Sequence, residues 1–133
     1  MCITTDHTVP DNNGLAISVQ VTHNNYSVIQ YDFYIPQIIW DLQDIQNFIQ
    51  QLQSIESSAT IFMGLVGVWQ GSPESLRIYR MILRTGQFNP DNVRNTIQNS
   101  IGDLMAKLSV TQHTQEEVMF TEMNLQVSKS ILI

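Results

Sequence analysis

Apolar and polar residues follow one another in patterns that predict two helices and five strands along this chain. Residues 15–21 alternate with a period of two, as the residues of a half-buried strand do. Residues 22–25 are of turn-forming types, and a second β-rich run follows over residues 26–35. We therefore predict that the two runs form a hairpin, which ends at Pro36.

Two amphipathic helices are predicted. Over residues 38–55, apolar residues recur at spacings of three and four and form one stripe opposite a polar face. This stripe consists of Ile38, Leu42, Ile45, Ile49 and Leu52, widened by Ile39, Phe48 and Ile55. In the second helix Asn89 is the cap, Pro90 occupies the first position and Asp91 lies in the first turn. Its buried stripe is Val93, Ile97, Ile101, Leu104 and Leu108, and Gly102 would allow close packing on the sheet.

Two further segments are predicted to be strands. Residues 59–69 are apolar and partly β-branched, which indicates a largely buried strand in which Gly64 and Gly67 mark a bulge or a close backbone approach. Near the end of the chain, the odd-numbered positions share one apolar face. That face predicts a terminal strand whose inner side carries Met119, Met123, Leu125, Val127 and Ile131.

Residues 72–85 fit two structures. Ser72-Pro73-Glu74 is a good helix start, and Gly86 could end such a helix. However, Gly71 with the two residues after it can equally turn a hairpin, and residues 78–83 favour a strand. We predict the strand, because it completes a sheet with the preceding segment.

The predicted order is β-β-α-β-β-α-β, which gives an α+β fold. Without the first strand, it is the β-α-β-β-α-β arrangement of a ferredoxin-like sheet, with both helices on one face. We expect a single α+β domain over residues 15–133. The preceding residues 1–14 are polar and end in Pro10-Asp11-Asn12-Asn13-Gly14, which predicts a flexible N-terminal arm that runs into a turn.

Charge is distributed unevenly along the chain. Residues 1–76 contain seven acids and no Lys or Arg, whereas residues 77–133 contain six bases and five acids. Such an acidic chain is a poor binder of nucleic acid or of an anionic membrane surface, because both require a row of basic residues. The acidic first half could instead bind a protein partner with a basic surface.

Only 14% of the residues are charged, where about 25% is ordinary for a soluble domain. A weakly charged exterior is poorly protected against association. Two explanations fit this deficit equally well: composition bias of the genome, and coverage of the exterior in a homo-oligomer. No run approaches the ~20 apolar residues that span a bilayer. The N-terminal residues lack the features of a signal peptide, so a cytoplasmic location is predicted.

Reactive and metal-binding side chains are few. The single cysteine, Cys2, cannot form an internal disulfide. Removal of Met1 would turn Cys2 into an N-terminal nucleophile, although an unimportant thiol is the favoured interpretation. His7, His23 and His113 are scattered over polar segments and are interpreted as loop histidines. No metal site and no cofactor are therefore predicted. The methionines, especially Met105, Met119 and Met123, either fill the core, which is favoured, or build an adaptable binding surface.

One set of residues is a candidate site for a ligand or partner: Trp69, Glu74, Arg77, Arg80, Arg84 and Glu116. In a ferredoxin-like sheet, Trp69 and Glu74 would lie near the hairpin turn. Arg80 and Arg84 would share a face with Ile78 and Ile82, and Arg77 would point to the other side. The favoured interpretation is an ion pair of one of these arginines with Glu74 or Glu122. The functional alternative is a sheet surface that binds an anion or a carboxylate, or a basic stripe if the segment is helical.

Residues 64–120 resemble small uncharacterised ferredoxin-like bacterial proteins. The resemblance rests on Gly67-Val68-Trp69, on Glu74-Ser75 opening a strand, on the helix that follows, and on Gln115-Glu116-Glu117-Val118 leading into the last strand. It supports the strand from Glu74 to Leu83, and it implies no reaction.

These observations lead to a hypothesis of function. We predict a non-catalytic interaction protein that self-associates through its sheet or an edge strand. The alternative is an enzyme or a small-molecule-binding protein with a cleft between sheet and helices. It would need a closed apolar pocket that contains Trp69 or Tyr79 and a converging Glu or Arg. A structural subunit of an extended assembly is a third possibility.

Overall fold

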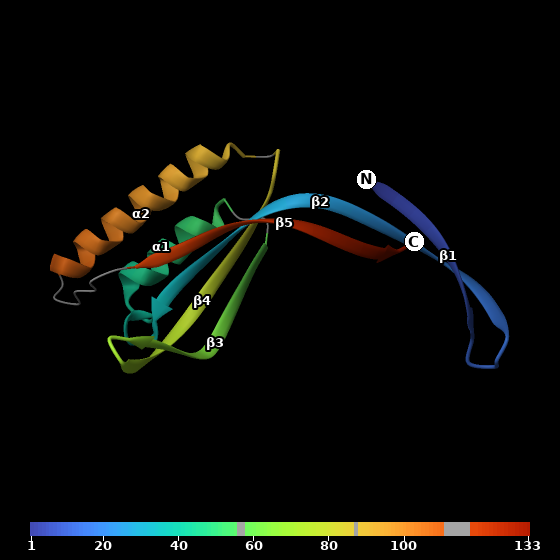
Figure 1. Ribbon diagram of the computed structural model, residues 1–133, viewed down its shortest axis with the longest axis horizontal. Coiled ribbons are helices and arrows are strands. Elements are labelled where there is room, and N and C mark those ends of the chain that lie inside the picture. The colour runs from blue at the N-terminus through green and yellow to red at the C-terminus, as the bar shows by residue number, and fades with distance from the viewer. Residues whose placement is uncertain (56–57, 87, 111–117) are drawn as a thin grey trace. The chain divides into compact units, whose positions relative to one another are not determined.

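The structure is a computed structural model that describes residues 1–55, 58–86, 88–110 and 118–133, with the side chains of Ser58 and Trp69 excepted. Its elements in chain order are β1 (Cys2–Pro10), β2 (Ala16–Pro36), the 3-10 turn η1 (Gln37–Ile39), α1 (Gln43–Gln53), β3 (Ser58–Trp69), β4 (Ser72–Arg84), α2 (Pro90–Val110) and β5 (Met119–Leu132) (Figure 1). Contacts group them into two compact units. We call residues Met1–Val28 with Leu125–Ile133 the ribbon unit, and residues Ile29–Asn124 the helical unit.

The helical unit has the ferredoxin-like topology. Its strands lie in the order β5-β2-β4-β3, and β3 pairs with β4 in an antiparallel ladder. Residues 72–84 form β4, so the predicted strand is confirmed and the helical alternative is wrong. Without β1, the chain therefore runs β-α-β-β-α-β through one antiparallel sheet, and the predicted α+β fold is confirmed.

The core lies between the two helices and one face of the sheet. Odd-numbered residues of β2 and β4 are buried on this face: Tyr31, Phe33, Ile35, Tyr79, Met81 and Leu83. They pack against the apolar stripes of both helices, which confirms that α1 and α2 lie on the same face. Phe33 is central, since the ring centroids of Phe48, Tyr79 and Phe120 lie 5.7, 6.4 and 5.7 Å from its own. Burial of each large side chain stabilises the fold by roughly 1.5–3 kcal/mol.

The helices differ from the prediction in detail. The first is interrupted, because Leu42 adopts an extended conformation between η1 and α1. As a result, Ile38 is 85% exposed instead of buried. The cap of the second helix is confirmed: Asn89 Oδ1 accepts hydrogen bonds from the backbone N–H groups of Asp91 and Asn92. Gly102 would have no atom within 4 Å of an added Cβ, so the predicted close packing there is wrong.

The N-terminal residues form a strand where the sequence predicts a flexible arm. β1 pairs with β2 in an antiparallel ladder that places Cys2 opposite Asn24 and Pro10 opposite Ala16. The turn predicted before residue 15 is present, with Asp11 Oδ1 accepting from the N–H of Leu15. Residues 22–25 lie inside β2 and make no turn, because their ladder with β1 keeps them extended. The predicted hairpin of residues 15–21 and 26–35 is therefore wrong. The single domain over residues 15–133 stays a prediction.

Two strands expose apolar faces that were predicted to be buried. β3 is an edge strand, and Ile61, Met63, Val66 and Val68 on it are 46–74% exposed. Its register shifts between Phe62 and Leu65, so the predicted bulge is confirmed at Gly64, which has a φ of +70°. An added Cβ on Gly67 would lie 2.6 Å from Leu76 Cδ2, so the close approach there involves a side chain.

In β5 the predicted inner face has the wrong parity within the helical unit, whereas Leu125 and Val127, further along the strand, are partly buried as predicted. The even-numbered residues Val118 and Phe120 pack against the core. Met119 and Met123 therefore lie on the face away from the helices, and they are 49% and 53% exposed.

Two glycine substitutions should change stability in opposite directions. Gly64→Ala should destabilise the protein by roughly 1–2 kcal/mol, because a positive φ strains any residue with a Cβ. Gly102→Ala should stabilise it by up to about 1 kcal/mol, because Ala is the better helix former and the site has room. Urea unfolding measures both changes. Destabilisation by Gly102→Ala would contradict the open environment described for this residue.

Candidate functional site

The sheet of the helical unit has a second face, which we call the open face. Side chains alternate along each strand and the helices pack on the odd-numbered side of β2 and β4. The open face therefore carries no helix in the part of the chain that the structure describes. It consists of Gln30, Asp32 and Tyr34 of β2, Thr60, Phe62 and Leu65 of β3, Glu74, Leu76, Ile78, Arg80, Ile82 and Arg84 of β4, and Met119, Thr121 and Met123 of β5.

A bidentate ion pair lies in the middle of the open face. Arg80 Nε donates to Asp32 Oδ1 and Arg80 Nη2 donates to Asp32 Oδ2, each at 2.9 Å. The Asp32 side chain is 9% exposed and that of Arg80 is 32% exposed. The guanidinium carbon lies 4.7 Å from the centroid of the Phe62 ring, which adds a cation–π contact. The hydrogen bond to Asp32 is the main reason why the pKa of Arg80 is raised.

This pair changes the interpretation of Arg80. The sequence predicts Glu74 or Glu122 as the partner of such an arginine, and the structure places Asp32 there instead. Asp32 occupies the Nε–Nη2 edge of the guanidinium and balances its charge, so the anion-binding alternative loses its central residue. Asp32 could have been suspected from the sequence, because it is the one charged residue in the β-rich run of residues 26–35.

Arg77 points to the other face of β4, as predicted. Its Nε donates to Gln37 Oε1 at 2.7 Å, and its guanidinium carbon lies 4.9 Å from the centroid of the Trp40 ring. Both partners belong to the segment around η1. Arg77 therefore anchors the connection between β2 and α1 on the helix side of the sheet.

The structure does not assemble the six predicted site residues into one place. Glu74 lies opposite Gly67 and Trp69 lies opposite Ser72 in the β3–β4 ladder, so both are near the hairpin turn, as predicted. Arg84 is exposed at the end of β4. Glu116 lies outside the described residues, and the direction of the Trp69 side chain is not described.

A second ion pair joins α2 to β5 on the helix side. Arg94 Nη2 lies 2.6 Å from Glu122 Oε1, and Arg94 also contacts Asp91. Glu122 therefore has an arginine partner, but it is not one of the three predicted. The hydrogen bond from Arg94 is the main reason why the pKa of Glu122 is lowered. Burial raises the pKa of the nearby Tyr31, and Glu122 raises it further.

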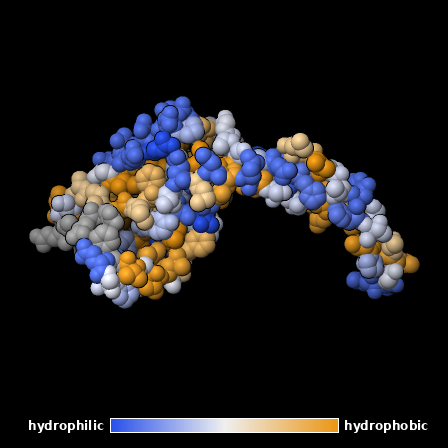
Figure 2. Space-filling model, in the orientation of Figure 1, coloured by the Kyte–Doolittle hydropathy of each residue, from blue (hydrophilic) through white to orange (hydrophobic). Residues whose placement is uncertain are grey.

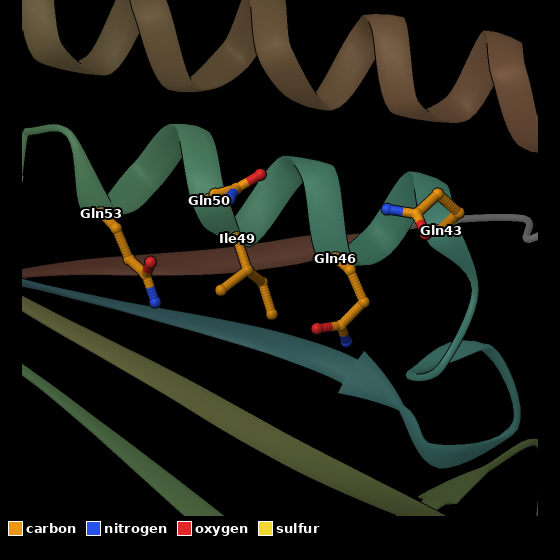
Figure 3. Close-up of a pocket in the computed structure, with 5 residues that line it drawn as sticks. All are labelled: Gln43, Gln46, Ile49, Gln50 and Gln53. Carbon is orange, nitrogen blue, oxygen red and sulfur yellow. The ribbon is translucent and has the colours of Figure 1, made fainter.

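A pocket lies along α1. Gln43, Gln46, Ile49, Gln50 and Gln53 line it, and Figure 3 shows Gln46, Ile49 and Gln53 projecting from the same side of the helix. Its lining includes neither Tyr79 nor an acidic or basic residue. Amide side chains can donate and accept hydrogen bonds, but they cannot act as general acids or bases. This pocket is therefore not the cleft that the enzyme alternative requires.

Cys2 and two of the histidines lie in the ribbon unit. Cys2 is exposed on β1. His7 and His23 are strand residues and not loop residues, and the Nε2 atom of each lies within 3.0 Å of Thr5 Oγ1. His113 lies outside the described residues. Within the described residues, no group of three or more His, Cys, Asp or Glu side chains is placed to hold a metal ion.

Comparisons with known proteins find a similarity in fold alone. No family model and no curated protein matches the chain. Among solved structures, it is similar to CPII, a nitrogen regulatory PII-like protein from Thiomonas intermedia K12. The form bound to ADP, AMP and bicarbonate has 10% identity and a TM-score of 0.43, and the match covers 78% of this chain and 98% of that one. The apo form has 9% identity and a TM-score of 0.44, with 80% and 98% covered.

These similarities are too low to identify a family or to transfer a ligand. The resemblance of residues 64–120 to small uncharacterised bacterial proteins also stays a prediction. Among the helices of the described residues, none is long and apolar enough to cross a membrane.

The ion pair on the open face should respond unequally to loss of either partner. Arg80→Ala should destabilise the protein by about 2–3 kcal/mol, because it leaves the nearly buried Asp32 carboxylate without its partner. Asp32→Ala should cost only about 1 kcal/mol, because the more exposed Arg80 can turn to water. Urea unfolding of both variants and of the double variant tests this. Equal losses, or a double variant less stable than Arg80→Ala, would contradict it.

The pair on the helix side predicts an acid-dependent stability. The folded-state pKa of Glu122 lies below its ordinary value of 4.5. Its contribution is therefore complete above that value and disappears as the pH falls through the folded-state pKa. Glu122→Gln should lower the urea midpoint at neutral pH, and the difference from wild type should shrink between about pH 5 and pH 3. Arg94→Gln should do the same. A constant difference across this pH range would rule out the assigned cause.

Proposed function

We propose that this protein is a non-catalytic interaction protein that self-associates through the open face of its sheet. One observation carries this proposal: apolar side chains occupy the open face on three of its four strands, and the two charges in its middle, Asp32 and Arg80, form one closed ion pair. A sheet with one face in water normally alternates apolar and polar residues, with the polar ones toward the solvent. The open face departs from that pattern.

The apolar residues lie on both sides of the ion pair. Met119 and Met123 of β5 are about half exposed. On the other side of β2 are the partly covered residues Phe62, Leu65, Ile78 and Ile82. Methionine adapts its shape to a contacting surface. The sequence favoured core filling for the methionines over an adaptable binding surface. For Met119 and Met123, their exposure supports the binding surface.

The ion pair favours association on this face. Its two charges cancel, so the pair itself adds no like-charge repulsion between two copies, although each chain carries a net charge of −6. The pair is already hydrogen-bonded within one chain, and its carboxylate is largely dehydrated. Covering it therefore removes less water than covering a free charge would. The low fraction of charged residues in the whole chain is consistent with a partly covered exterior.

The structure gives less support to a basic protein partner and to an enzyme or ligand-binding cleft. The basic protein partner would need a concentration of acids, but Asp32, one of the seven acids of the first half, is neutralised by Arg80. The enzyme or ligand-binding alternative would need acidic or basic groups in its pocket, and the pocket along α1 has an amide lining. Both stay predictions.

Sedimentation velocity over a range of protein concentrations tests the proposal. Wild type should form a dimer or larger species, and the double substitution Met119→Lys with Met123→Lys should weaken that association by at least about 100-fold, because it replaces apolar contacts by like charges. Val110→Lys, at an 84% exposed residue of α2, is the matched control and should associate like wild type. A wild-type protein that is monomeric at all concentrations would refute the proposal.

A further inference from the structure

The outer edge of β3 is a second surface of interest. β3 is the last strand in the order β1-β2-β4-β3, so β4 satisfies one edge of its backbone, and its other edge has no strand beside it within the described residues. The strand is twelve residues long, about twice the usual length. An edge of this length presents a row of unpaired N–H and C=O groups to any added strand.

β3 lacks most of the features that protect natural edges. Proteins usually protect an edge with charged residues, proline or a short strand, but Ser58–Trp69 contains neither a charged residue nor proline. Its one irregularity is the bulge at Gly64. Four apolar side chains on it are 46–74% exposed, namely Ile61, Met63, Val66 and Val68. Figure 2 shows hydrophobic side chains gathered along the lower border of the helical unit, where Figure 1 draws β3.

The register of β3 shows where these side chains lie. Val66 and Val68 stand opposite Ser75 and Pro73, and Ile61 stands opposite the buried Tyr79. Paired residues share a face of the sheet, so these three residues lie on the helix side, at an edge that the helices leave uncovered. The bulge separates the strand into two runs, and residues 65–69 contain Val68 and Val66, which are more exposed than Ile61 and Met63 in the same strand.

We propose that β3 pairs with β3 of a second copy of this chain, in an antiparallel ladder about a two-fold axis near Val66 and Val68. Such pairing is self-complementary, because residue i meets residue j and residue j meets residue i. It also joins the apolar strips of the two copies across the new ladder, where they cover each other.

The absence of charge on β3 is compatible with a second copy as the partner. The chain carries a net charge of −6, so two copies repel each other over most orientations. An uncharged edge is where that repulsion is weakest. A charged partner, in turn, would find no charge on Ser58–Trp69 to recognise.

This edge is separate from the open face, so the inference goes beyond the proposed function and does not rest on it. A protein that uses both surfaces has two different two-fold contacts. Two such contacts join more than two copies. The species formed by wild type should therefore be larger than a dimer, and each contact should be removable by itself.

Sedimentation velocity of two sets of variants separates the contacts. Val66→Lys with Val68→Lys should weaken the edge contact roughly 100-fold, because like charges then face each other across the ladder. Ile38→Lys, at an 85% exposed residue outside the sheet, is the control and should behave like wild type. The open-face variant Met119→Lys with Met123→Lys should leave the edge-paired dimer intact. Combining both pairs of substitutions should give a monomer.

The outcomes distinguish the two proposals. Loss of assembly in the edge variant alone would support the edge contact and refute the open-face contact. Loss in the open-face variant alone, with the edge variant like wild type, would overturn the edge contact. Amide hydrogen exchange of wild type gives a test that needs no substitution. Amides of residues 65–68 should become protected as protein concentration rises, and exchange that is independent of concentration would overturn the inference.

Discussion

The alternation of side chains along β2 and β4 is the constraint on which the rest of the helical unit depends. Odd-numbered residues enter a core closed by two helices, and even-numbered residues form the opposite face of the same sheet. A shift of either strand by one residue would exchange these faces. In β2 it would place Asp32 under the helices and expose Phe33, and in β4 it would place Arg80 under the helices and expose Tyr79. The register is therefore fixed by the burial of large aromatic residues on one side.

The same constraint explains why Asp32 and Arg80 pair with each other. They occupy the same face of neighbouring strands in the middle of the sheet, where Asp32 is nearly buried and Arg80 is partly exposed. An isolated carboxylate at 9% exposure would be costly, and the bidentate guanidinium removes most of that cost. Phe62 on the adjacent strand then covers the guanidinium. The pair leaves the middle of this face electrically neutral, with apolar side chains beside it, and these are properties of a surface suited to contact with another sheet.

The two units differ in how their strands are covered. In the helical unit, helices cover one face, and within the described residues no helix covers the open face and no strand lies beside the outer edge of β3. In the ribbon unit, β1, the first part of β2 and the end of β5 pair without a helix, and the only residue buried among them is Val28. Three strands need an apolar face or a covering layer to be stable.

The local pattern of the sequence was sufficient to predict both helices, the strand from Glu74 onward and the ferredoxin-like order, because periodicity and capping act between neighbours in the chain. It could not decide which face of β5 is buried, since both parities of residues 118–131 contain apolar residues and only Phe33 and the helices select Phe120. Nor could it decide that residues 22–25 are extended, because the ladder with β1 overrides their turn-forming character. The partner of Arg80 was likewise decided by tertiary structure. Asp32 is 48 residues away, and only strand order brings the two side chains together.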